Sequence, residues 1–393
     1  MTKEERLAKK RAFIKEYDDF NKVFTFENLY ASYKECVKGV TWKPSVQRFI
    51  ADDIANLISL EKKLQNGTFK SKGFYEFDII ERGKPRHIRS VDIEERVVQR
   101  CLCDYCLVPV LSRSLIYDNG ASLKGKGQHF AIRRVKRHMK EYHNRFGNDG
   151  YALTMDFKGY FDSIPHWLVY QIVDDTFSDE RLKALIHHSV DAFGDVGLGL
   201  GSQISQILAV TIPNSLDHYA KEQLKVRWYG RYNDDMWFIC QTKEQAKEIA
   251  GRVTAYAETL GLTTHPNKIK ISHLQSGFKL MKIKFILKPT GYVVMLTDKK
   301  KVVRQRRKLK KIKRKVDCGI LTSHDGFLSW QGWDCSIRIC KSYKQRKEIK
   351  ELAMSLFGKD DFNVLQANRK WKNRRRSKEP SLCPVAKEKQ YPC

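Results

Sequence analysis

Two neighbouring acids, Asp234 and Asp235, constrain this chain more than any other feature because they interrupt an apolar stretch. Residues 231–233 precede them and residues 236–239 follow, and aromatic and aliphatic residues of this kind favour strands. The pattern predicts a β-hairpin with the acids at its turn. Taken alone, such a pair is also common on surface loops.

A second apolar stretch, residues 153–155, leads into Asp156. If the two stretches pair as neighbouring strands, Asp156 joins Asp234 and Asp235. Clustered carboxylates repel each other, and Mg²⁺ is their ordinary counter-charge. Two such ions can activate a 3′-hydroxyl and stabilise a leaving pyrophosphate, which is polymerase chemistry. A calcium site or unpaired surface acids are the alternatives.

Charge narrows the class of partner. Among 393 residues, 74 are Lys or Arg and 45 are Asp or Glu, which gives a net charge of +29. Such a chain repels itself unless a polyanion neutralises it, so nucleic acid or an anionic membrane surface is expected. No apolar run approaches the roughly 18 residues that span a bilayer, and the N-terminus opens a charged helix without a signal-peptide core. Nucleic acid is therefore the favoured partner.

The ten cysteines are irregularly spaced, and Cys101, Cys103 and Cys106 fall in a segment predicted to be a buried helix. No partner group at zinc-finger spacing accompanies them, so packing thiols are favoured over metal ligands. Unpaired thiols indicate a reducing, cytoplasmic compartment.

Periodicity and charge predict an α+β fold in five parts. The parts are an N-terminal helical extension, a segment opening with a basic hairpin, a layered segment that carries the acids, a cationic helical segment and a basic, flexible tail. Their expected ranges are 1–67, 68–150, 151–298, 299–360 and 361–393. Within the third part, residues 262–271 are expected to form a strand and residues 278–296 a hairpin. Asp217 is expected on the polar side of a helix.

Basic segments are candidates for phosphate contacts. Lys124 and Lys126 alternate with glycines, which let backbone amides and ammonium groups approach phosphate closely. The loop is not a Walker loop because the Gly-Lys-Ser/Thr ending is missing. Residues 299–315 keep an apolar helical stripe, and nearly every other position is cationic, which fits contact with a phosphate backbone. A solvated surface is the usual alternative for such charge runs.

Together these residues resemble a prokaryotic reverse transcriptase of the group that includes group II intron maturases, diversity-generating retroelements and defence-associated enzymes. The resemblance covers about residues 68–356. The segment from Asp156 to Asp162 looks like the first catalytic motif, and residues 232–235 look like the Tyr-X-Asp-Asp box, with Asn233 where a small apolar residue is usual. It implies a right-hand polymerase with fingers, an antiparallel palm with helices on one face, and a helical thumb.

The resemblance also implies a set of site residues. The catalytic residues are Asp156, Asp234, Asp235 and Lys268, the last as the lysine that protonates pyrophosphate. The metal-binding residues, for two Mg²⁺ with Mn²⁺ as the alternative, are Asp156, Asp234, Asp235 and Phe157. The nucleotide-binding residues are Lys84, Arg86, Lys124, Lys126, Phe161 and Gln206. The nucleic-acid-binding residues are Gly201, Ser202, Lys308, Lys311 and Arg314.

Phe161 stands five residues after Asp156, where similar enzymes carry an aromatic gate against the ribose 2′-hydroxyl. A ring beneath the sugar leaves no room for an extra oxygen, so dNTPs are the expected substrates. The loop 200–206 has the Leu-Gly and Ser-Gln form that resembles diversity-generating retroelements and some relatives in phage defence. The resemblance also implies a non-coding RNA template and an accessory protein as partners, both encoded elsewhere.

The resulting hypothesis is an RNA-directed DNA polymerase that copies a non-coding or retroelement RNA, in anti-phage defence or in retroelement mutagenesis. One alternative is a maturase-like RNA-binding scaffold. Another is a protein-primed or untemplated DNA polymerase in abortive phage defence. A complete set of three acids discriminates against the scaffold, because a protein that only binds RNA gains nothing from packing them together.

Overall fold

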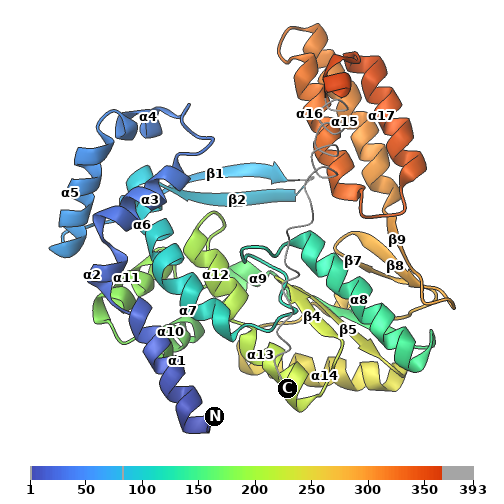
Figure 1. Ribbon diagram of the computed structural model, residues 1–393, viewed down its shortest axis with the longest axis horizontal. Coiled ribbons are helices and arrows are strands. Elements are labelled where there is room, and N and C mark those ends of the chain that lie inside the picture. Colours follow the sequence, from blue (N-terminus) through green and yellow to red (C-terminus); the bar gives the residue numbers. More distant parts are fainter. Residues whose placement is uncertain (1, 82–83, 365–393) are drawn as a thin grey trace, which may run out of the picture. The chain divides into compact units, whose positions relative to one another are not determined.

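Figure 1 shows the computed structural model of the chain, which describes residues 2–81 and 84–364. The chain divides into two compact units. The first comprises Met1–Met281 and Ile286–Val293, and the second comprises Lys282–Phe285 and the chain from Val294 onward. The first unit combines helices with antiparallel strands, which agrees with the expected α+β class. In the described part, no helix is both long enough and apolar enough to cross a membrane.

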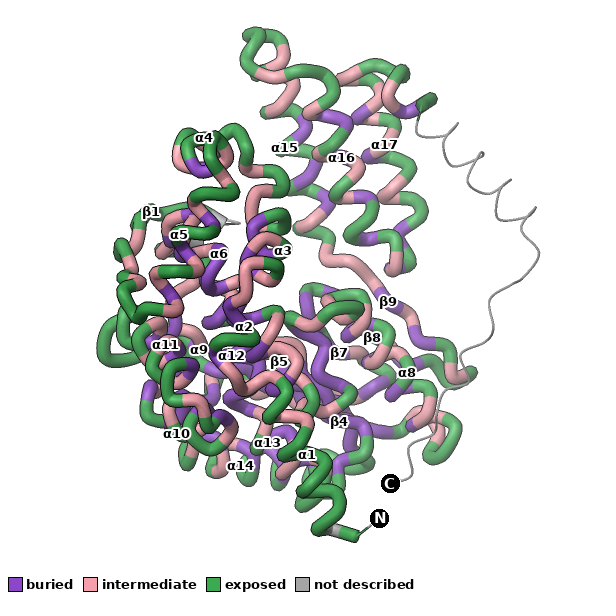
Figure 2. The backbone as a smooth tube through the Cα atoms, turned by 60° about the vertical axis from the view of Figure 1, so that its left-hand side comes forward, coloured by how far each residue is buried: buried purple, intermediate pink, exposed green. Residues whose placement is uncertain are grey.

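Short amphipathic helices make up the N-terminal part of the first unit. Thr25 caps the third of them, because its hydroxyl accepts the backbone N–H of Asn28 at 3.3 Å. Phe24, Leu29 and Leu57 are completely buried in the main core, and α1 is exposed along most of its length (Figure 2). These helices are α1 (Lys3–Tyr17), α2 (Phe20–Val23), α3 (Phe26–Cys36), α4 (Pro44–Ile50) and α5 (Asp53–Gln65).

A two-stranded hairpin follows, as the sequence predicts. Strand β1 (Phe74–Glu81) pairs antiparallel with β2 (Lys84–Val91). The edge of β2 is tied to a distant loop, because the backbone N–H of Arg89 donates to the carbonyl of Leu200 at 3.3 Å. The hairpin therefore connects to the segment that leads into α12.

A four-stranded antiparallel sheet in the order β4-β5-β3-β6 lies at the centre of the first unit. Its strands are β3 (Tyr151–Met155), β4 (Tyr229–Tyr232), β5 (Asp235–Cys240) and β6 (Lys270–His273). Strands β4 and β5 form the predicted hairpin, and residues 233–234 are its turn. Strand β5 also pairs with β3, so the two apolar stretches are neighbours as expected.

Helices contact both faces of this sheet, whereas the resemblance implied helices on one face. Trp237 of β5 donates its indole N–H to His138 of α8 (Gln128–Phe146) at 3.2 Å. The next residue along β5, Phe238, points to the opposite face and belongs to the core that includes Ile249 of α14 (Lys243–Thr259). Because successive side chains of a strand point to opposite faces, α8 and α14 cover different sides.

The remaining helices of the first unit connect these strands. They are α6 (Ile93–Leu102), η1 (Cys103–Leu107), α7 (Val108–Leu111), η2 (Ser112–Ser114), α9 (Tyr160–Ser163), α10 (His166–Thr176), α11 (Glu180–Asp191), α12 (Gln203–Thr211), α13 (Asn214–His218), η3 (Tyr219–Gln223) and η4 (Pro266–Lys268). Cys101, Cys103 and Cys106 are buried in α6 and η1, and burial raises the pKa of Cys101 to about 12. Their placement fits packing thiols.

Two local predictions differ from the structure. The stretch 262–271 was expected to be a strand, but Pro266 opens the turn η4 and β6 begins only at Lys270, because proline lacks a backbone N–H for a ladder. Residues 278–296 hold the expected hairpin, formed by β8 (Ile283–Leu287) and β9 (Val293–Thr297), but an additional strand, β7 (Phe278–Leu280), precedes it in the same sheet. Met281, with φ of 48°, and Lys282, with φ of 63°, form the additional turn.

The second unit is built around three helices, α15 (Lys299–Asp317), α16 (Ser323–Ile337) and α17 (Tyr343–Phe357). A small core that includes Leu309, Trp330 and Ile349 holds them together. The cations of α15 lie outside this core, and Lys308, Lys311 and Arg314 are exposed. The predicted basic tail falls outside the described residues from position 365 onward.

Candidate active site

The register of the central sheet brings the predicted acids together. Met155 of β3 is paired with Met236 of β5, so the next step of the same register sets Asp156 opposite Asp235. Directly opposed residues on antiparallel strands have Cβ atoms about 4.5–5.5 Å apart. The turn before β5 presents Asp234, whose carboxyl is close enough to Asp156 for a hydrogen bond.

The electrostatics of Asp234 reflect this crowding. Burial, and then the negative charges of Asp156 and Asp235, raise the pKa of Asp234 to about 7. Asp156 is only 7% exposed. When both carboxyls are ionised, the buried Oδ1 atom of Asp156 has no hydrogen-bond donor among the described residues. An acid pair of this kind is destabilised unless a proton or a cation is added.

Lys268 supplies one cation at this position, because its Nζ donates to Oδ2 of Asp156. The backbone holds the two residues near each other. The N–H of His265 donates to the carbonyl of Asp156 at 2.8 Å, and the N–H of Lys268 donates to the carbonyl of His265 at 2.9 Å. The lysine side chain remains 48% exposed, so Lys268 lies at the edge of the acid cluster rather than within the core.

The hairpin that carries Asp234 and Asp235 rests on a buried ion pair that the sequence did not predict. Arg231 and Asp217 both have no exposed surface, and Nη2 of Arg231 lies 2.7 Å from Oδ2 of Asp217. Nη1 of Arg231 donates to the carbonyl of Asn233 at 3.0 Å. The expectation that Asp217 lies on a polar helix side is therefore wrong, and the carboxylate instead faces a cation inside the protein.

A second network attaches the glycine-lysine loop to the same hairpin. The N–H of Gly120 donates to the carbonyl of Arg231 at 2.9 Å. Asp118, which precedes Gly120, accepts hydrogen bonds from Arg134 at 2.5 Å and from Lys221 at 3.0 Å. Burial by itself would raise the pKa of Asp118, but its hydrogen-bonded and cationic neighbours hold the pKa well below its usual range. The loop is thus fixed to β4.

These strands and helices fall within the part of the chain that matches a known protein family. The model of the reverse transcriptase (RNA-dependent DNA polymerase) family matches residues 81–312, which is more than half of the chain. The chain belongs to the reverse transcriptase family. It is an RNA-directed DNA polymerase, a nucleotidyltransferase that binds an RNA template and dNTPs. No curated protein matches the sequence.

Reverse transcriptases generally use divalent metal ions. Across residues 2–81 and 84–364, no group of three or more His, Cys, Asp or Glu side chains is already placed to hold an ion. The buried, donor-free Oδ1 of Asp156 and the raised pKa of Asp234 nevertheless fit a cation, because each would be relieved by positive charge. Carboxylate oxygens are also the donors that Mg²⁺ prefers.

The predicted gate of the reverse transcriptase, Phe161, is half-buried on α9. Its ring meets the ring of Tyr160 edge-on, with the centroids 5.7 Å apart. Tyr160 stacks on Phe157 at 5.1 Å and donates its hydroxyl hydrogen to the carbonyl of Ala209 at 2.5 Å. The gate ring is therefore supported by a buried aromatic neighbour that is itself fixed.

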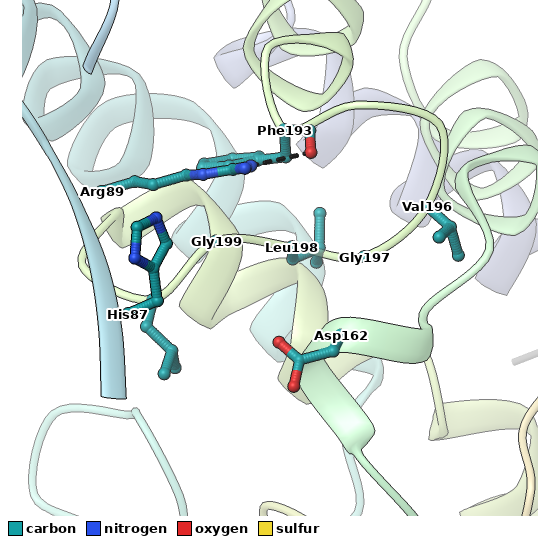
Figure 3. Close-up of a pocket in the computed structure, with 9 residues that line it drawn as sticks. His87, Arg89, Asp162, Phe193, Val196, Gly197, Leu198 and Gly199 are labelled. Atoms are coloured by element: carbon teal, nitrogen blue, oxygen red, sulfur yellow. Dashed lines mark hydrogen bonds between the residues drawn. The ribbon is translucent and has the colours of Figure 1, made fainter. Parts of the chain in front are cut away.

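A cavity of about 200 Å³ lies between β2, Asp162 and the loop before α12, and Asp162 is the residue that follows Phe161 (Figure 3). Nη1 of Arg89 donates to the carbonyl of Phe193 at 2.8 Å, so the hairpin is joined to that loop. In Figure 3, the His87 ring and the Asp162 carboxyl lie on two sides of the open space. The cavity has both a basic and an acidic group on its wall.

The loop that leads into α12 is constrained by its backbone. Gly201 has φ of 118°, and a Cβ there would lie 3.0 Å from the carbonyl oxygen of Arg89, so glycine is required. The Ser202 hydroxyl is buried, where it accepts the N–H of Ser205 and donates to Gln99 at 3.1 Å. Ser202 therefore caps α12, while Gln206 is exposed on that helix.

The predicted triphosphate ligands occupy different environments. Lys126 donates to the carbonyl of Tyr117 at 2.8 Å, and burial lowers its pKa. Lys124 is exposed on the same loop. Arg86 lies on β2 opposite Ile79, and the side chain of Lys84 is outside the described part of the chain. Lys126 thus stabilises its own loop, which the alternation of Gly and Lys alone did not reveal.

Sequence reasoning missed the residues that support the site, above all Arg231, Asp217 and Asp118. One signal was present, because Arg231 is a lone charge within an apolar strand next to the two acids. A charge in such a position needs a buried partner. The partner itself, 14 positions earlier on α13, is set by the tertiary fold.

Proposed function

We propose that this reverse transcriptase adds dNTPs to a 3′-hydroxyl by a two-metal mechanism in which Asp156, Asp234 and Asp235 hold the ions. The observation that carries the proposal is the β3–β5 register, which leads Asp156 to a position opposite Asp235 and beside Asp234. Mg²⁺ is the proposed ion and Mn²⁺ the alternative, because all three side chains offer hard carboxylate oxygens. When bound, the ions would activate the 3′-hydroxyl and stabilise the departing pyrophosphate.

Phe157 contributes through its backbone in this proposal. It forms an antiparallel bridge with Thr264. On either side of this bridge, the carbonyl of Asp156 accepts the N–H of His265, and the N–H of Lys158 donates to the carbonyl of Thr263. A residue between such hydrogen bonds turns its own carbonyl away from that partner strand. The Phe157 carbonyl is thereby directed toward the side on which β5 lies, where it would complete the oxygen ligands.

Lys268 has two roles in succession. Its ammonium neutralises Asp156 in the structure, and it would release this carboxylate when a metal ion takes the same oxygen. The freed Nζ then lies at the acid cluster, where it would donate a proton to pyrophosphate. The ring of Phe161 packs edge-on against Tyr160. In this proposal the ring would occupy the space that a ribose 2′-hydroxyl needs and would thereby exclude ribonucleotides.

The other parts of the chain take their proposed roles from the position of the three acids. We propose that residues 68–150 act as fingers, residues 151–298 as the palm and residues 299–360 as the thumb, between the extension 1–67 and the tail 361–393. Lys124 and Arg86 would meet the triphosphate, and Gln206 and the backbone of Gly201 would lie against the templating pair. The exposed cations Lys308, Lys311 and Arg314 on α15 suit a nucleic-acid backbone.

The biological role we propose is copying of a non-coding or retroelement RNA, in anti-phage defence or in retroelement mutagenesis. The loop 200–206, with its Leu-Gly and Ser-Gln form, supports this choice. Sequencing the RNA that co-purifies with the protein tests it. An upstream repeat pair in that RNA would indicate mutagenesis, and a short structured RNA with a repeated complementary product would indicate defence.

Primer extension tests the proposed chemistry. Purified protein is incubated with an oligo(dT) primer on a poly(rA) template, dTTP and Mg²⁺. Digestion of the product by a deoxyribonuclease shows that it is DNA. The proposal expects extension by the natural protein and none by the Asp234→Ala, Asp235→Ala variant. Extension by that variant would contradict the assignment of Asp234 and Asp235 to the active site. An RNA-binding scaffold would instead bind the template without extending the primer in either protein.

A further inference from the structure

A cavity of about 420 Å³ lies between the N-terminal helix α1 and the helix α7, and no residue of the proposed active site lines it. Arg6, Lys9, Lys10 and Phe13 of α1 face it, which is the spacing of one side of a helix. Ile14, Val110 and Leu111 add apolar surface. The volume falls within the range of about 300–1,000 Å³ that is typical of small-molecule sites.

The walls of this cavity are anchored to the rest of the first unit. Just after α1, the Asp18 carboxylate accepts the backbone N–H of Ser178 at 2.6 Å and that of Asp179 at 3.1 Å. The guanidinium carbon of Arg113 lies 4.0 Å from the ring centroid of Phe13. Helix α1 is therefore held at both the cavity and its C-terminal end, although most of its surface is exposed (Figure 2).

The charge around the cavity is unbalanced. Four cations, Arg6, Lys9, Lys10 and Arg113, line it together with a single acid, Asp175. Among the described residues, none of the four cations forms an ion pair with an acid. Cations gathered at a cavity without acid partners are suited to an anionic ligand, and phosphate groups satisfy several of them at once.

We propose that this cavity binds a nucleoside phosphate unit outside the polymerase cleft. The phosphate would lie at Lys9, Lys10 and Arg6, and the base against the apolar wall beside the stacked Arg113 and Phe13. Nucleobases stack on aromatic rings and on guanidinium planes, so this wall offers both kinds of surface. The ligand is either a free nucleotide or one nucleotide of a single-stranded RNA.

Binding measurements on matched variants test the proposal. The probes are fluorescently labelled ATP and a labelled oligoadenylate, both in EDTA so that metal-dependent binding at the catalytic acids does not contribute. The variant Lys9→Ala, Lys10→Ala removes two cavity cations. The control variant Arg11→Ala, Lys15→Ala removes the same charge from exposed positions of the same helix that do not line the cavity. Ile14→Trp fills the cavity without changing charge.

We expect the cavity variant and Ile14→Trp to lose affinity for at least one probe, while the control variant binds as the natural protein does. If the oligoadenylate is the ligand, the cavity variant no longer neutralises one phosphate, so the salt dependence of log K should fall by up to about 0.7. Binding of ATP identifies a free nucleotide, and binding of the oligoadenylate alone identifies an RNA strand. Thermal melting checks that each variant is folded.

Three results would overturn the proposal. Equal losses in the cavity and control variants would show unspecific attraction to a polyanion, and an unchanged affinity in Ile14→Trp would show that the cavity itself is not used. Binding to anionic phosphatidylserine vesicles without binding to either probe would identify a lipid surface instead. Because the substitutions spare the catalytic acids, primer extension reports separately on the polymerase assignment.

Discussion

Arg231 and Asp217 are joined by an ion pair that has no exposed surface, with Nε of Arg231 2.9 Å from Oδ1 and Nη2 2.7 Å from Oδ2 of Asp217. The same guanidinium donates to the carbonyl of Asn233, in the turn between β4 and β5, and to the carbonyl of Val210. One buried cation thus connects α12, α13 and the turn that presents Asp234.

Removing one member of this pair should destabilise the protein strongly. Asp217→Asn leaves the guanidinium without its counter-charge in the core, and we expect a loss of about 3–5 kcal/mol in the free energy of unfolding. The double variant Arg231→Met, Asp217→Leu removes both charges and should unfold close to the natural protein in urea. It should extend primers more slowly, because Asn233 loses its donor. Normal extension by a stable double variant would show that the pair does not position the turn.

The acid cluster should make the stability of the metal-free protein depend on pH. The pKa of Asp234 is raised from 3.8 to about 7, so the native state keeps this proton where the unfolded chain has lost it. Stability should therefore fall as pH rises from about 4 to 7, by about 4 kcal/mol at most. Urea unfolding in EDTA measures this decline. Asp234→Asn should lack it, and an identical decline in that variant would assign it to other groups.

Proton release should accompany metal binding for the same reason. Below pH 7 a metal ion must displace the proton of Asp234, so Mg²⁺ affinity should rise by up to about tenfold per pH unit until the carboxyl is ionised. Calorimetric titration of the protein with Mg²⁺ at several pH values measures this. An affinity that is constant over this range would contradict a metal site that includes Asp234.

The turn between β4 and β5 should be sensitive to the residue at position 233. Asn233 has φ of 53°, a left-handed conformation that Asn and Gly accept more readily than other residues. Asn233→Ala should cost about 1 kcal/mol in stability, while Asn233→Gly should be nearly neutral. Thermal unfolding of the two variants compares them directly. If both variants melt at the same temperature, the backbone conformation is not what favours Asn here.

Sugar selection should depend on the ring of Phe161. Phe161→Val opens the space that the ring fills, so the preference for dNTPs over rNTPs should fall by about tenfold or more in single-nucleotide incorporation. Phe161→Tyr keeps the ring and serves as the control, with an unchanged preference. A valine variant that still rejects ribonucleotides would place the gate elsewhere.

The sequence predicted the elements whose periodicity is local and strong. The β4–β5 hairpin, the β1–β2 hairpin and the cationic helix α15 all lie where their patterns indicate. The features that the sequence did not predict depend on residues far away in the chain. Nothing near Asp217 shows that Arg231 neutralises it, and nothing near Ser202 shows that its hydroxyl bonds with Gln99. Pro266 illustrates a local misreading, because its turn interrupts an otherwise strand-like stretch.

In the candidate site, too, the sequence predicted what depends on local pattern and missed what depends on distant partners. Clustering of Asp156 with Asp234 follows from two apolar strands that end in acids, and the register confirms that these strands are neighbours. The environment of Lys126 was not predictable, because the carbonyl and rings that hold it are positioned by the fold of its loop.

The most direct test of the account is single-nucleotide incorporation by the Asp156→Asn variant on a primed RNA template, with Mg²⁺ affinity measured on the same protein. Asparagine preserves the size of the side chain, so the variant should remain folded and bind primer–template normally. The account expects both incorporation and Mg²⁺ binding to fall to background. Incorporation at the natural rate would contradict the assignment of Asp156, Asp234 and Asp235 as the metal-binding centre.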